Sequence, residues 1–425
     1  MEIIAKKVTP LEGQWKRPEG AVLNVSCEGR DYSLLASKCG MRAKKAEGNA
    51  CTAWVGERDE TLKCSFSSEE AYSMSILPGG VTIAANTADG LSMGVKALWR
   101  LLSKSDVLEC ARMDDEPAVR FRAVHLCVFP KYDGTQKEDT SPEALRNMIS
   151  EAAYWGYNRV FIEFWGCFPY QKHPYACWPD TEYSPETVSE ILSECMDGLH
   201  MTALPVQNLT SHAGWSRISS RKHVVLDQRP DLAPMWIPGG WCFATENPDT
   251  RAYLRDVMDE LIEAYRTPPL FHVSTDKCFG FGSSEADRVY DADRLFVRHL
   301  NFLHDALMER GCRMMMWTDM LYGALDSKFW KAAPEVVDQL PRDILMNVWT
   351  HNDVGLCWPD VDFFQGKGYE TVYSPFINED SIRNMISMCQ RKHSLGIVQT
   401  TWFCPQTAIP YVRLSGKLQW EGKER

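Results

Sequence analysis

The sequence predicts a (β/α)8 barrel preceded by a small α+β domain. From residue 121 onward, eight apolar runs of strand length alternate with helical segments. Residues 1 to 115 differ, because they carry short strand-like runs, a hairpin signal and one amphipathic helix. The chain has 425 residues, which is enough for both units at about 100–200 residues per domain. We therefore expect a small domain over residues 1–115 and a barrel over residues 116–425.

In the first domain, strand-like runs occupy Ala21–Val25 and Tyr32–Ala36. Two further runs, Tyr72–Leu77 and Val81–Asn86, are joined by Pro78-Gly79-Gly80, which predicts a hairpin. Leucine and valine then recur at helical spacing between residues 91 and 102, which predicts a helix packed on these strands. The acidic stretch at 114–117 ends in proline and is interpreted as a polar linker.

Eight apolar runs of strand length follow in the second domain. They are Arg122–Val128, Arg159–Phe164, Thr202–Gln207, Leu270–Asp276, Arg313–Asp319, Ile344–Trp349, Glu370–Phe376 and Gly396–Trp402. Eight units in about 300 residues are typical of a closed barrel. An open doubly wound sheet is the alternative, but it does not require eight units. No G-x-G-x-x-G follows a strand to support a dinucleotide-binding version of it.

Strong helix starts separate several of these strands. Ser141-Pro142-Glu143, Ser184-Pro185-Glu186 and Asn247-Pro248-Asp249 each combine an N-cap residue, a proline at the first helical position and an acidic residue that suits the helix dipole. The connection over residues 208–246 lacks a long periodic helix. A loop of this length after the third strand is typical of a functional insertion, and in a barrel it lies on the C-terminal face.

Composition and charge exclude several classes of protein. With 46 basic and 57 acidic residues, the net charge is −11, so we expect no nucleic-acid partner. No apolar run reaches the roughly 18 residues of a membrane span, so we expect no membrane partner. The first residues lack the apolar core of a secretory signal, and the 15 cysteines show no C-x-x-C pair. We therefore expect a cytoplasmic protein with reduced thiols.

The ends of the barrel strands carry a recurring set of polar and aromatic residues. These residues are Glu163, Trp165, Gln207, Asn208, Asp276, Lys277, Trp317, Asp319, Trp349, His351, Ser374, Thr400 and Trp402. Aromatic faces stack on sugar rings, and carboxylates and amides bind hydroxyls, so the mixture favours a carbohydrate ligand. Alternatively, each tryptophan packs in the barrel core. His212, in the long loop, belongs to the same predicted pocket.

We expect no cofactor and no metal. No H-x-H or H-E-x-x-H motif is present, and neither is a phosphate-binding glycine loop or a G-x-S-x-G elbow. A metallohydrolase remains an alternative, in which Glu163, Asp319, His351 and Asp353 assemble a site in space. The sequence leaves the oligomeric state open.

Several segments, taken in order, resemble glycoside hydrolase family 20, the β-N-acetylhexosaminidases. They are the hairpin with Gly90-x-x-x-Gly94, Phe121–Leu126, Phe168-Pro169-Tyr170 and Lys222–Gln228, the last two being similar to bacterial members. The most specific is His272-Val273-Ser274-Thr275-Asp276-Lys277, which falls where the family has H-x-G-x-D-E. The resemblance implies a barrel that cleaves β-linked N-acetylhexosaminides with help from the substrate's own acetamide.

The resemblance also implies roles for residues of the site. Asp276 matches the aspartate that orients the acetamide, while Lys277 stands where the family has its acidic glutamate. A lysine with an ordinary pKa near 10.4 is a poor proton donor to an ether oxygen. Pro130 stands near the position of a sugar-binding arginine, whose contacts Lys131 would take over. His351 lies where related members often have a tyrosine that supports the acetamide.

Three explanations for Lys277 stay open at this point. In the first, the chain is a glycosidase in which Glu163 or Asp319 supplies the proton. In the second, it is a non-catalytic sugar-binding relative that has lost the acid. In the third, Lys277 was introduced deliberately to trap a substrate. The first two differ in whether a second carboxyl lies across the pocket from Asp276, at about the 5–10 Å of paired glycosidase carboxylates.

Overall fold

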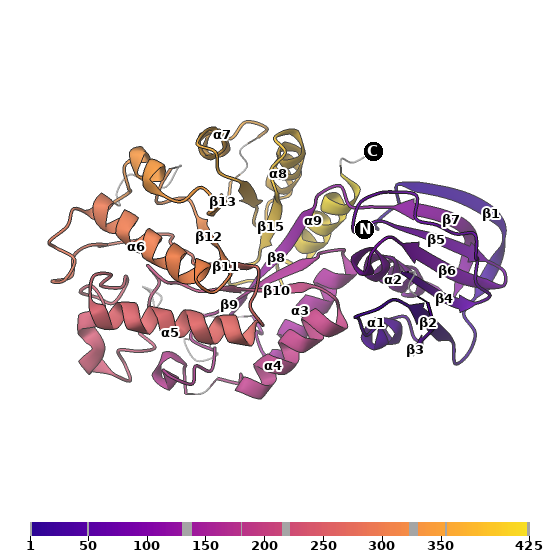
Figure 1. Ribbon diagram of the computed structural model, residues 1–425, viewed down its shortest axis with the longest axis horizontal. Coiled ribbons are helices and arrows are strands. Elements are labelled where there is room, and N and C mark those ends of the chain that lie inside the picture. The colour runs from indigo at the N-terminus through magenta and orange to yellow at the C-terminus, as the bar shows by residue number, and fades with distance from the viewer. Residues whose placement is uncertain are drawn as a thin grey trace.

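The computed structural model describes residues 2–48, 51–129, 138–179, 181–214, 222–322, 330–352 and 355–422. Over these residues the chain forms a seven-stranded sheet near the N-terminus and a closed eight-stranded barrel (Figure 1). Every strand pair in the barrel is parallel. This arrangement confirms the predicted (β/α)8 barrel behind an α+β unit and excludes the open doubly wound sheet.

The N-terminal sheet has the strand order β1-β7-β5-β6-β4-β2-β3. Its strands are β1 (Lys7–Lys16), β2 (Val22–Ser26), β3 (Arg42–Lys45), β4 (Thr52–Gly56), β5 (Tyr72–Leu77), β6 (Gly80–Ala85) and β7 (Val107–Asp115). The predicted hairpin is β5–β6, which closes with Leu77 opposite Gly80. Helix α2 (Ala88–Leu102) contacts both of these strands and buries Leu91, Val95 and Leu98. The spacing of apolar residues therefore predicted this helix correctly.

Two expectations for this region are wrong. The run Tyr32–Ala36 lies in and beside helix α1 (Ser33–Lys38), not in a strand. Leucine and alanine are strong helix formers, and alanine is depleted in strands, so residue propensity favours the helix. A run this short carries no period that separates the two kinds of structure. Asp114 and Asp115 end strand β7 instead of forming a linker. Asp115 is buried, where its carboxylate accepts hydrogen bonds from Tyr72 Oη at 3.0 Å and Trp420 Nε1 at 2.7 Å.

The barrel strands follow in chain order. They are β8 (Phe121–Val128), β9 (Arg159–Phe164), β10 (Thr202–Val206), β11 (Leu270–His272), β12 (Arg313–Trp317), β13 (Leu345–Trp349), β14 (Thr371–Ser374) and β15 (Gly396–Thr400). Strand β15 pairs with β8 from Gly396 opposite Phe121 to Thr400 opposite His125, which closes the ring. The predicted division between two domains falls in the short connection from β7 to β8.

Helices cover the outside of the barrel (Figure 1). They are α3 (Pro142–Tyr154), α4 (Pro185–Ser193), α5 (Pro248–Ala264), α6 (Ala292–Met308), α7 (Pro359–Gly366), α8 (Glu379–Arg391) and α9 (Ile409–Glu421). The three predicted N-caps are confirmed, because the side chains of Ser141, Ser184 and Asn247 each accept a backbone N–H from the first turn. A π turn, η3 (Glu194–Gly198), extends α4.

Two connections depart from the simple strand–helix alternation. Between β12 and β13, the described residues contain only a 3-10 helix, η5 (Pro334–Gln339). The long loop after β10 contains one short 3-10 helix, η4 (Pro230–Met235), and no α-helix among its described residues. Isolated bridges, Ser211 with Cys242 and Trp236 with Phe243, fold this loop back on itself. A separate short 3-10 helix, η2 (Pro174–Ala176), follows β9.

The interior of the barrel is layered. A lower layer is apolar and is contributed by every strand: Phe121, Ala123, Phe161, Leu204, Val206, Leu270, Met315, Leu345, Val372 and Val398. Residues two positions further along a strand point to the same side, into the barrel. At these positions the side chains are polar or aromatic, among them His125, Glu163, His272, Trp317 and Asn347. All five are at most 1% exposed. The polar layer therefore lies directly above the apolar layer inside the barrel.

The two sheets are joined by a buried ion pair. The Arg122 guanidinium, from β8, donates to both carboxylate oxygens of Glu70, at 2.8 and 2.9 Å. Asn158 Nδ2 also donates to Glu70, and Arg122 is completely buried. Among the helices of the described residues, none is long and apolar enough to cross a bilayer.

Candidate active site

The backbone leaves the sheet early at the end of β11. The expected strand reaching Asp276 is wrong, since β11 ends at His272. Ser274, Thr275 and Lys277 have φ angles of 65°, 86° and 52°, in the left-handed region that an extended strand cannot contain. Such residues cost about 1–3 kcal/mol each and persist where surrounding contacts hold them. Here the Thr275 hydroxyl donates to the Trp317 carbonyl at 3.1 Å, and Trp317 N–H donates to the Ser274 carbonyl at 2.9 Å.

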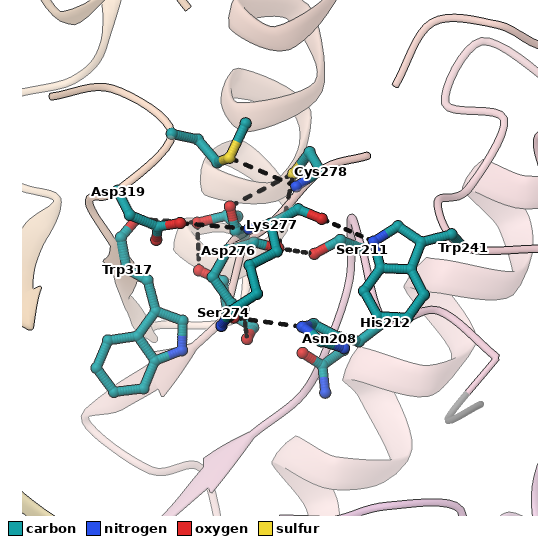
Figure 2. A network of polar contacts seen from close by, with 12 residues as sticks. Asn208, Ser211, His212, Trp241, Ser274, Asp276, Lys277, Cys278, Trp317 and Asp319 are labelled. Atoms are coloured by element: carbon teal, nitrogen blue, oxygen red, sulfur yellow. Dashed lines mark hydrogen bonds and ion pairs between the residues drawn. The ribbon is translucent and has the colours of Figure 1, made fainter. Parts of the chain in front are cut away.

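Asp276 lies at the centre of the site, and its carboxylate has three polar neighbours. Lys277 Nζ lies 2.6 Å from Oδ2, His212 Nε2 lies 3.3 Å from the same oxygen, and Ser274 Oγ donates to Oδ1 at 3.1 Å. The Asp276 carbonyl also accepts a hydrogen bond from the Ser211 hydroxyl. Figure 2 shows His212 on one side of Asp276 and Asp319 on the other.

Asp276 stays ionised despite its burial. Its side chain is 4% exposed, and desolvation acts to raise its pKa. The Lys277 ammonium and the His212 imidazole outweigh this effect and hold the pKa of Asp276 well below its usual range. A carboxylate of this kind accepts hydrogen bonds throughout the neutral pH range but does not donate a proton.

Lys277 stays charged for the complementary reason. Burial acts to lower its pKa, but the carboxylates of Asp276 and Asp319 raise it above the ordinary value. The ammonium also lies 4.8 Å from the centroid of the Trp349 ring and 5.9 Å from that of Trp402, both cation–π distances. Lys277 therefore forms an ion pair with Asp276, 2.6 Å from its Oδ2. Lys277 is therefore poorly suited to protonate a leaving group.

Asp319, which follows β12, behaves in the opposite way to Asp276. Its Oδ1 accepts from Trp349 Nε1 at 3.1 Å, and its Oδ2 accepts from the Lys277 backbone N–H at 3.3 Å. Burial and the negative charge of Asp276 raise the pKa of Asp319 to about 6, against the opposing effect of Lys277. The two aspartates therefore share Lys277 as a neighbour, and their environments separate their pKa values.

Glu163, at the end of β9, is held in a different network. Asn208 Nδ2 donates to its Oε1 at 2.6 Å, and His125 Nε2 lies 2.9 Å from its Oε2. The Cys127 thiol donates to the same Oε2 at 3.4 Å. Glu163 is 1% exposed. Because three side chains occupy both of its oxygens, Glu163 is less available to a substrate than Asp319 is.

The predicted tryptophans come together at one end of the barrel. The ring centroids of Trp317 and Trp402 are 5.4 Å apart, and those of Trp349 and Trp402 are 6.4 Å apart. His351 packs against Trp349 at 5.0 Å and is exposed to solvent. Trp317 is 1% exposed and packs on His272 at 4.4 Å, so it also forms part of the core beneath the site. Trp349 is only partly buried.

The long loop supplies the opposite wall. His212 lies 5.3 Å from Trp165 and 4.4 Å from Trp241, between the two rings. Trp241 Nε1 donates to the Lys277 carbonyl at 2.7 Å and stacks on Phe279. The loop after the third strand therefore reaches the site, as its length and position predicted.

Sequence reasoning missed several residues of the site. Trp241 and Ser211 lie in the long loop without a distinctive motif. Ser211 could have been indicated because it precedes His212 in the sequence, but Trp241 meets His212 only in the folded loop. His125 and Cys127 form an H-x-C pair on a strand, a spacing that points both side chains into the barrel. His272, whose pKa burial and the nearby His125 hold well below the usual value, is hydrogen-bonded to Asn347 at 3.3 Å. Pro130, Lys131 and Asp353 lie outside the described residues.

Solved structures with a similar arrangement cover nearly the whole chain. A family 20 exo-β-N-acetylglucosaminidase from Vibrio harveyi, in complex with N-acetylglucosamine, matches with a TM-score of 0.70 at 12% identity, over 100% of this chain and 74% of that one. A β-N-acetylhexosaminidase from Bacteroides fragilis matches with a TM-score of 0.70 at 13% identity, over 99% and 91%. A chitobiase from Flavobacterium johnsoniae matches with 0.66 at 15%, over 98% and 69%. The chain has the fold of glycoside hydrolase family 20.

These matches confirm the predicted structural resemblance, because the chain has a glycoside hydrolase-like fold. The sequence itself matches no protein-family model and no curated protein. Within the fold, the resembling motif occupies the left-handed turn after β11. Ser274 stands at its glycine position with a φ of 65°, a conformation that glycine adopts without strain. A serine at this position is strained, but its hydroxyl donates a hydrogen bond to Asp276 that glycine could not make.

Proposed function

We propose that this protein is a glycoside hydrolase acting on a β-linked N-acetylhexosaminide, with Asp319 in the role of general acid. The observation that carries the proposal is the pair formed by Asp276 and Asp319, which both contact Lys277. One carboxylate is held ionised, and the other has a pKa raised to about 6. Glycosidase sites commonly contain two carboxyl groups with different pKa values, one of which stays ionised while the other acts as the acid.

The ligand class is supported by the surfaces around this pair. Trp349 and Trp402 supply aromatic faces for a sugar ring, and His351 extends the same wall. Asn208 and His212 supply groups that bind hydroxyls or an acetamide. The Vibrio harveyi enzyme with this fold holds N-acetylglucosamine, which favours an amino sugar over other sugars.

In the proposed reaction, the substrate's acetamide oxygen attacks the anomeric carbon as the bond to the leaving oxygen breaks. Asp276 accepts a hydrogen bond from the acetamide N–H and stabilises the positive charge that develops there. The Asp319 carboxyl gives its proton to the leaving oxygen. Water then attacks the anomeric carbon, the bond from that carbon to the acetamide oxygen breaks, and the Asp319 carboxylate takes the proton that the water loses. Trp349 and the Lys277 backbone N–H orient Asp319 through both of its oxygens. Lys277 contributes charge, not a proton.

The pH dependence of turnover tests this assignment on the full chain. With an aryl N-acetyl-β-glucosaminide, kcat/KM should fall as the pH rises through about 6, because Asp319 loses its proton. Asp319→Asn should remove this limb and reduce the rate on unactivated disaccharides by about 10²- to 10⁴-fold. The loss should be smaller with a good leaving group, which needs little protonation. An unchanged rate in Asp319→Asn would refute the assignment.

Lys277 variants distinguish Asp319 from Lys277 as the residue that gives the proton to the leaving oxygen. Lys277→Ala should keep activity if Asp319 is the acid. Lys277→Glu should add a second acid at the position where family 20 has one, and should raise the rate on unactivated substrates. If Lys277→Ala alone abolishes turnover while Asp319→Asn does not, the proton comes through Lys277.

One observation favours a second function, a sugar-binding protein without turnover. The Lys277 ammonium already occupies the Asp276 carboxylate that an acetamide would need. In that case no aryl glycoside is cleaved by the wild-type chain, while N-acetylglucosamine still binds in calorimetry. A Lys277→Glu variant that binds the sugar but cleaves no glycoside would support this second function.

A further inference from the structure

A compact group of three potential metal ligands lies inside the barrel. His125 and Cys127 come from β8, two residues apart, and Glu163 comes from the neighbouring β9. His125 and Glu163 are each 1% exposed, and Cys127 is 2% exposed. One ligand atom from each residue lies within 4.8 Å of the others. An imidazole, a thiol and a carboxylate therefore converge in a buried environment.

The distances between the three ligand atoms are close to those of tetrahedral zinc coordination. His125 Nε2 and Glu163 Oε2 are 2.9 Å apart, Cys127 Sγ and Oε2 are 3.4 Å apart, and Sγ and Nε2 are 3.7 Å apart. Tetrahedral zinc bonds of about 2.0–2.3 Å give edges of roughly 3.4–3.6 Å between ligand atoms. The 3.4 Å edge lies within this range and the 3.7 Å edge lies just above it. The 2.9 Å edge requires the carboxylate to move away from the imidazole by about half an ångström.

The charges and the second coordination shell also suit a divalent ion. A thiolate and a carboxylate together neutralise Zn²⁺, which makes the buried assembly uncharged overall. Asn208 Nδ2 holds the other oxygen of Glu163 at 2.6 Å and so leaves Oε2 as the single donor. Carboxylates and imidazoles that ligate metals are usually oriented by such hydrogen bonds.

We propose that His125, Cys127 and Glu163 form a binding site for Zn²⁺, with a fourth position left for a non-protein ligand. A mixed nitrogen, sulfur and oxygen set selects zinc over the oxygen-preferring Mg²⁺ and Ca²⁺. The site goes beyond the proposed function, which takes no step through these three side chains. The Trp402 ring lies 5.0 Å from the His125 ring, so the ion would sit directly against the aromatic wall of the candidate active site.

The competing arrangement is a hydrogen-bonded triad without an ion, in which His125 and Cys127 both donate to Glu163. Co²⁺ distinguishes the two, because a cobalt–thiolate bond produces a near-ultraviolet charge-transfer band that a hydrogen bond does not. The full chain is treated with a chelator, dialysed, and titrated with Co²⁺ and then with Zn²⁺. The wild-type protein should develop the band to one equivalent and lose it as Zn²⁺ displaces Co²⁺.

Cysteine variants show which thiol is responsible. Cys127→Ser should abolish the band. Cys51→Ser is the matched control, since Cys51 lies 3.4 Å from Cys27 in the N-terminal sheet and could bind metal adventitiously. That variant should retain the band at full amplitude. A band that survives in Cys127→Ser, or that disappears in Cys51→Ser, overturns the proposal.

Two further measurements keep the test decisive if a variant fails to fold. X-ray absorption of the zinc-loaded wild-type chain should give one sulfur at about 2.3 Å and nitrogen or oxygen neighbours at about 2.0–2.2 Å. Oxygen neighbours alone would overturn the proposal. Asn208→Ala should weaken Zn²⁺ binding by about 10- to 100-fold, as for other second-shell contacts. None of these results depends on glycosidase activity, so the proposed function and the metal site can fail separately.

Discussion

The Lys277 ammonium lies 2.6 Å from the Asp276 carboxylate of the preceding residue. Consecutive residues seldom meet in this way in a strand, because their side chains point to opposite faces. They meet here because the backbone after β11 is left-handed, with Lys277 itself at a φ of 52°. The ion pair is therefore a product of the turn as much as of the two residue types.

Removal of the lysine charge should destabilise the fold. Lys277→Met keeps the length of the side chain but leaves Asp276 buried with only His212 and Ser274 as partners. A hydrogen bond to a charged group is worth about 1.5–3 kcal/mol, so the free energy of unfolding should fall by roughly that amount at neutral pH. Urea denaturation measures the change. Lys172→Met, which breaks a more exposed pair with Asp256, is the control and should cost much less, because solvent screens that pair.

Asp319 should make the protein less stable as the pH rises. Its folded pKa, about 6, lies above the unfolded value, so the folded state keeps the proton longer. Between about pH 4 and 6, unfolding therefore releases a proton, and the free energy of unfolding falls with increasing pH. At 1.36 kcal/mol per unit, the full effect is roughly 3 kcal/mol. Asp319→Asn should lose this part of the pH dependence. Parallel stability curves for variant and wild type would contradict the assignment.

The tryptophans of the site should separate into two kinds. Trp317 is 1% exposed, so Trp317→Ala should cost about 3–5 kcal/mol of stability by leaving a cavity. Trp349 is partly buried, so Trp349→Ala should instead weaken sugar binding, by about 1–3 kcal/mol. Calorimetry with N-acetylglucosamine and thermal unfolding measure the two quantities on the same samples. If Trp349→Ala binds the sugar with wild-type affinity, this ring does not contact the ligand.

The link between the two sheets should depend on Glu70. Arg122 is fully buried, and Glu70→Gln leaves its charge without compensation, which should cost about 3–5 kcal/mol. The neighbouring Glu69→Gln is a matched control, because Glu69 is 76% exposed and lies 3.9 Å from the exposed Arg120. It should change stability by less than about 1 kcal/mol. Equal effects of the two substitutions in urea denaturation would contradict this account.

Local signals in the sequence predicted much of the fold. The caps at Ser141, Ser184 and Asn247 lie next to the helices that they start, so no distant contact was needed to recognise them. The eight strand runs were found for the same reason. Helix α1 was missed because a five-residue apolar run fits both kinds of structure. The early end of β11 was missed because contacts with Trp317, more than 40 residues away, hold the left-handed turn.

The site was predictable in composition but not in its electrostatics. Strand-end positions indicated Asp276, Lys277, Asp319 and the tryptophans, because a barrel brings the carboxyl ends of its strands together. The opposite pKa shifts of Asp276 and Asp319 depend on burial and on their separate contacts with Lys277, which no spacing reveals. The convergence of Cys127 with Glu163 depends likewise on the register between β8 and β9, where these two residues lie opposite each other.

The shortness of β11 has a consequence for the motions of the barrel. β11 and β10 share one registered pair, Val206 with His272, whereas β8 and β9 share six. Amide hydrogens along this seam should exchange with solvent sooner than those of the other strand pairs, since few ladder bonds must open together. The segment that carries Asp276 and Lys277 is thus attached to the most weakly laddered part of the wall. It is therefore held by its contacts with Trp317 and Asp319 on the β12 side more than by the ladder to β10.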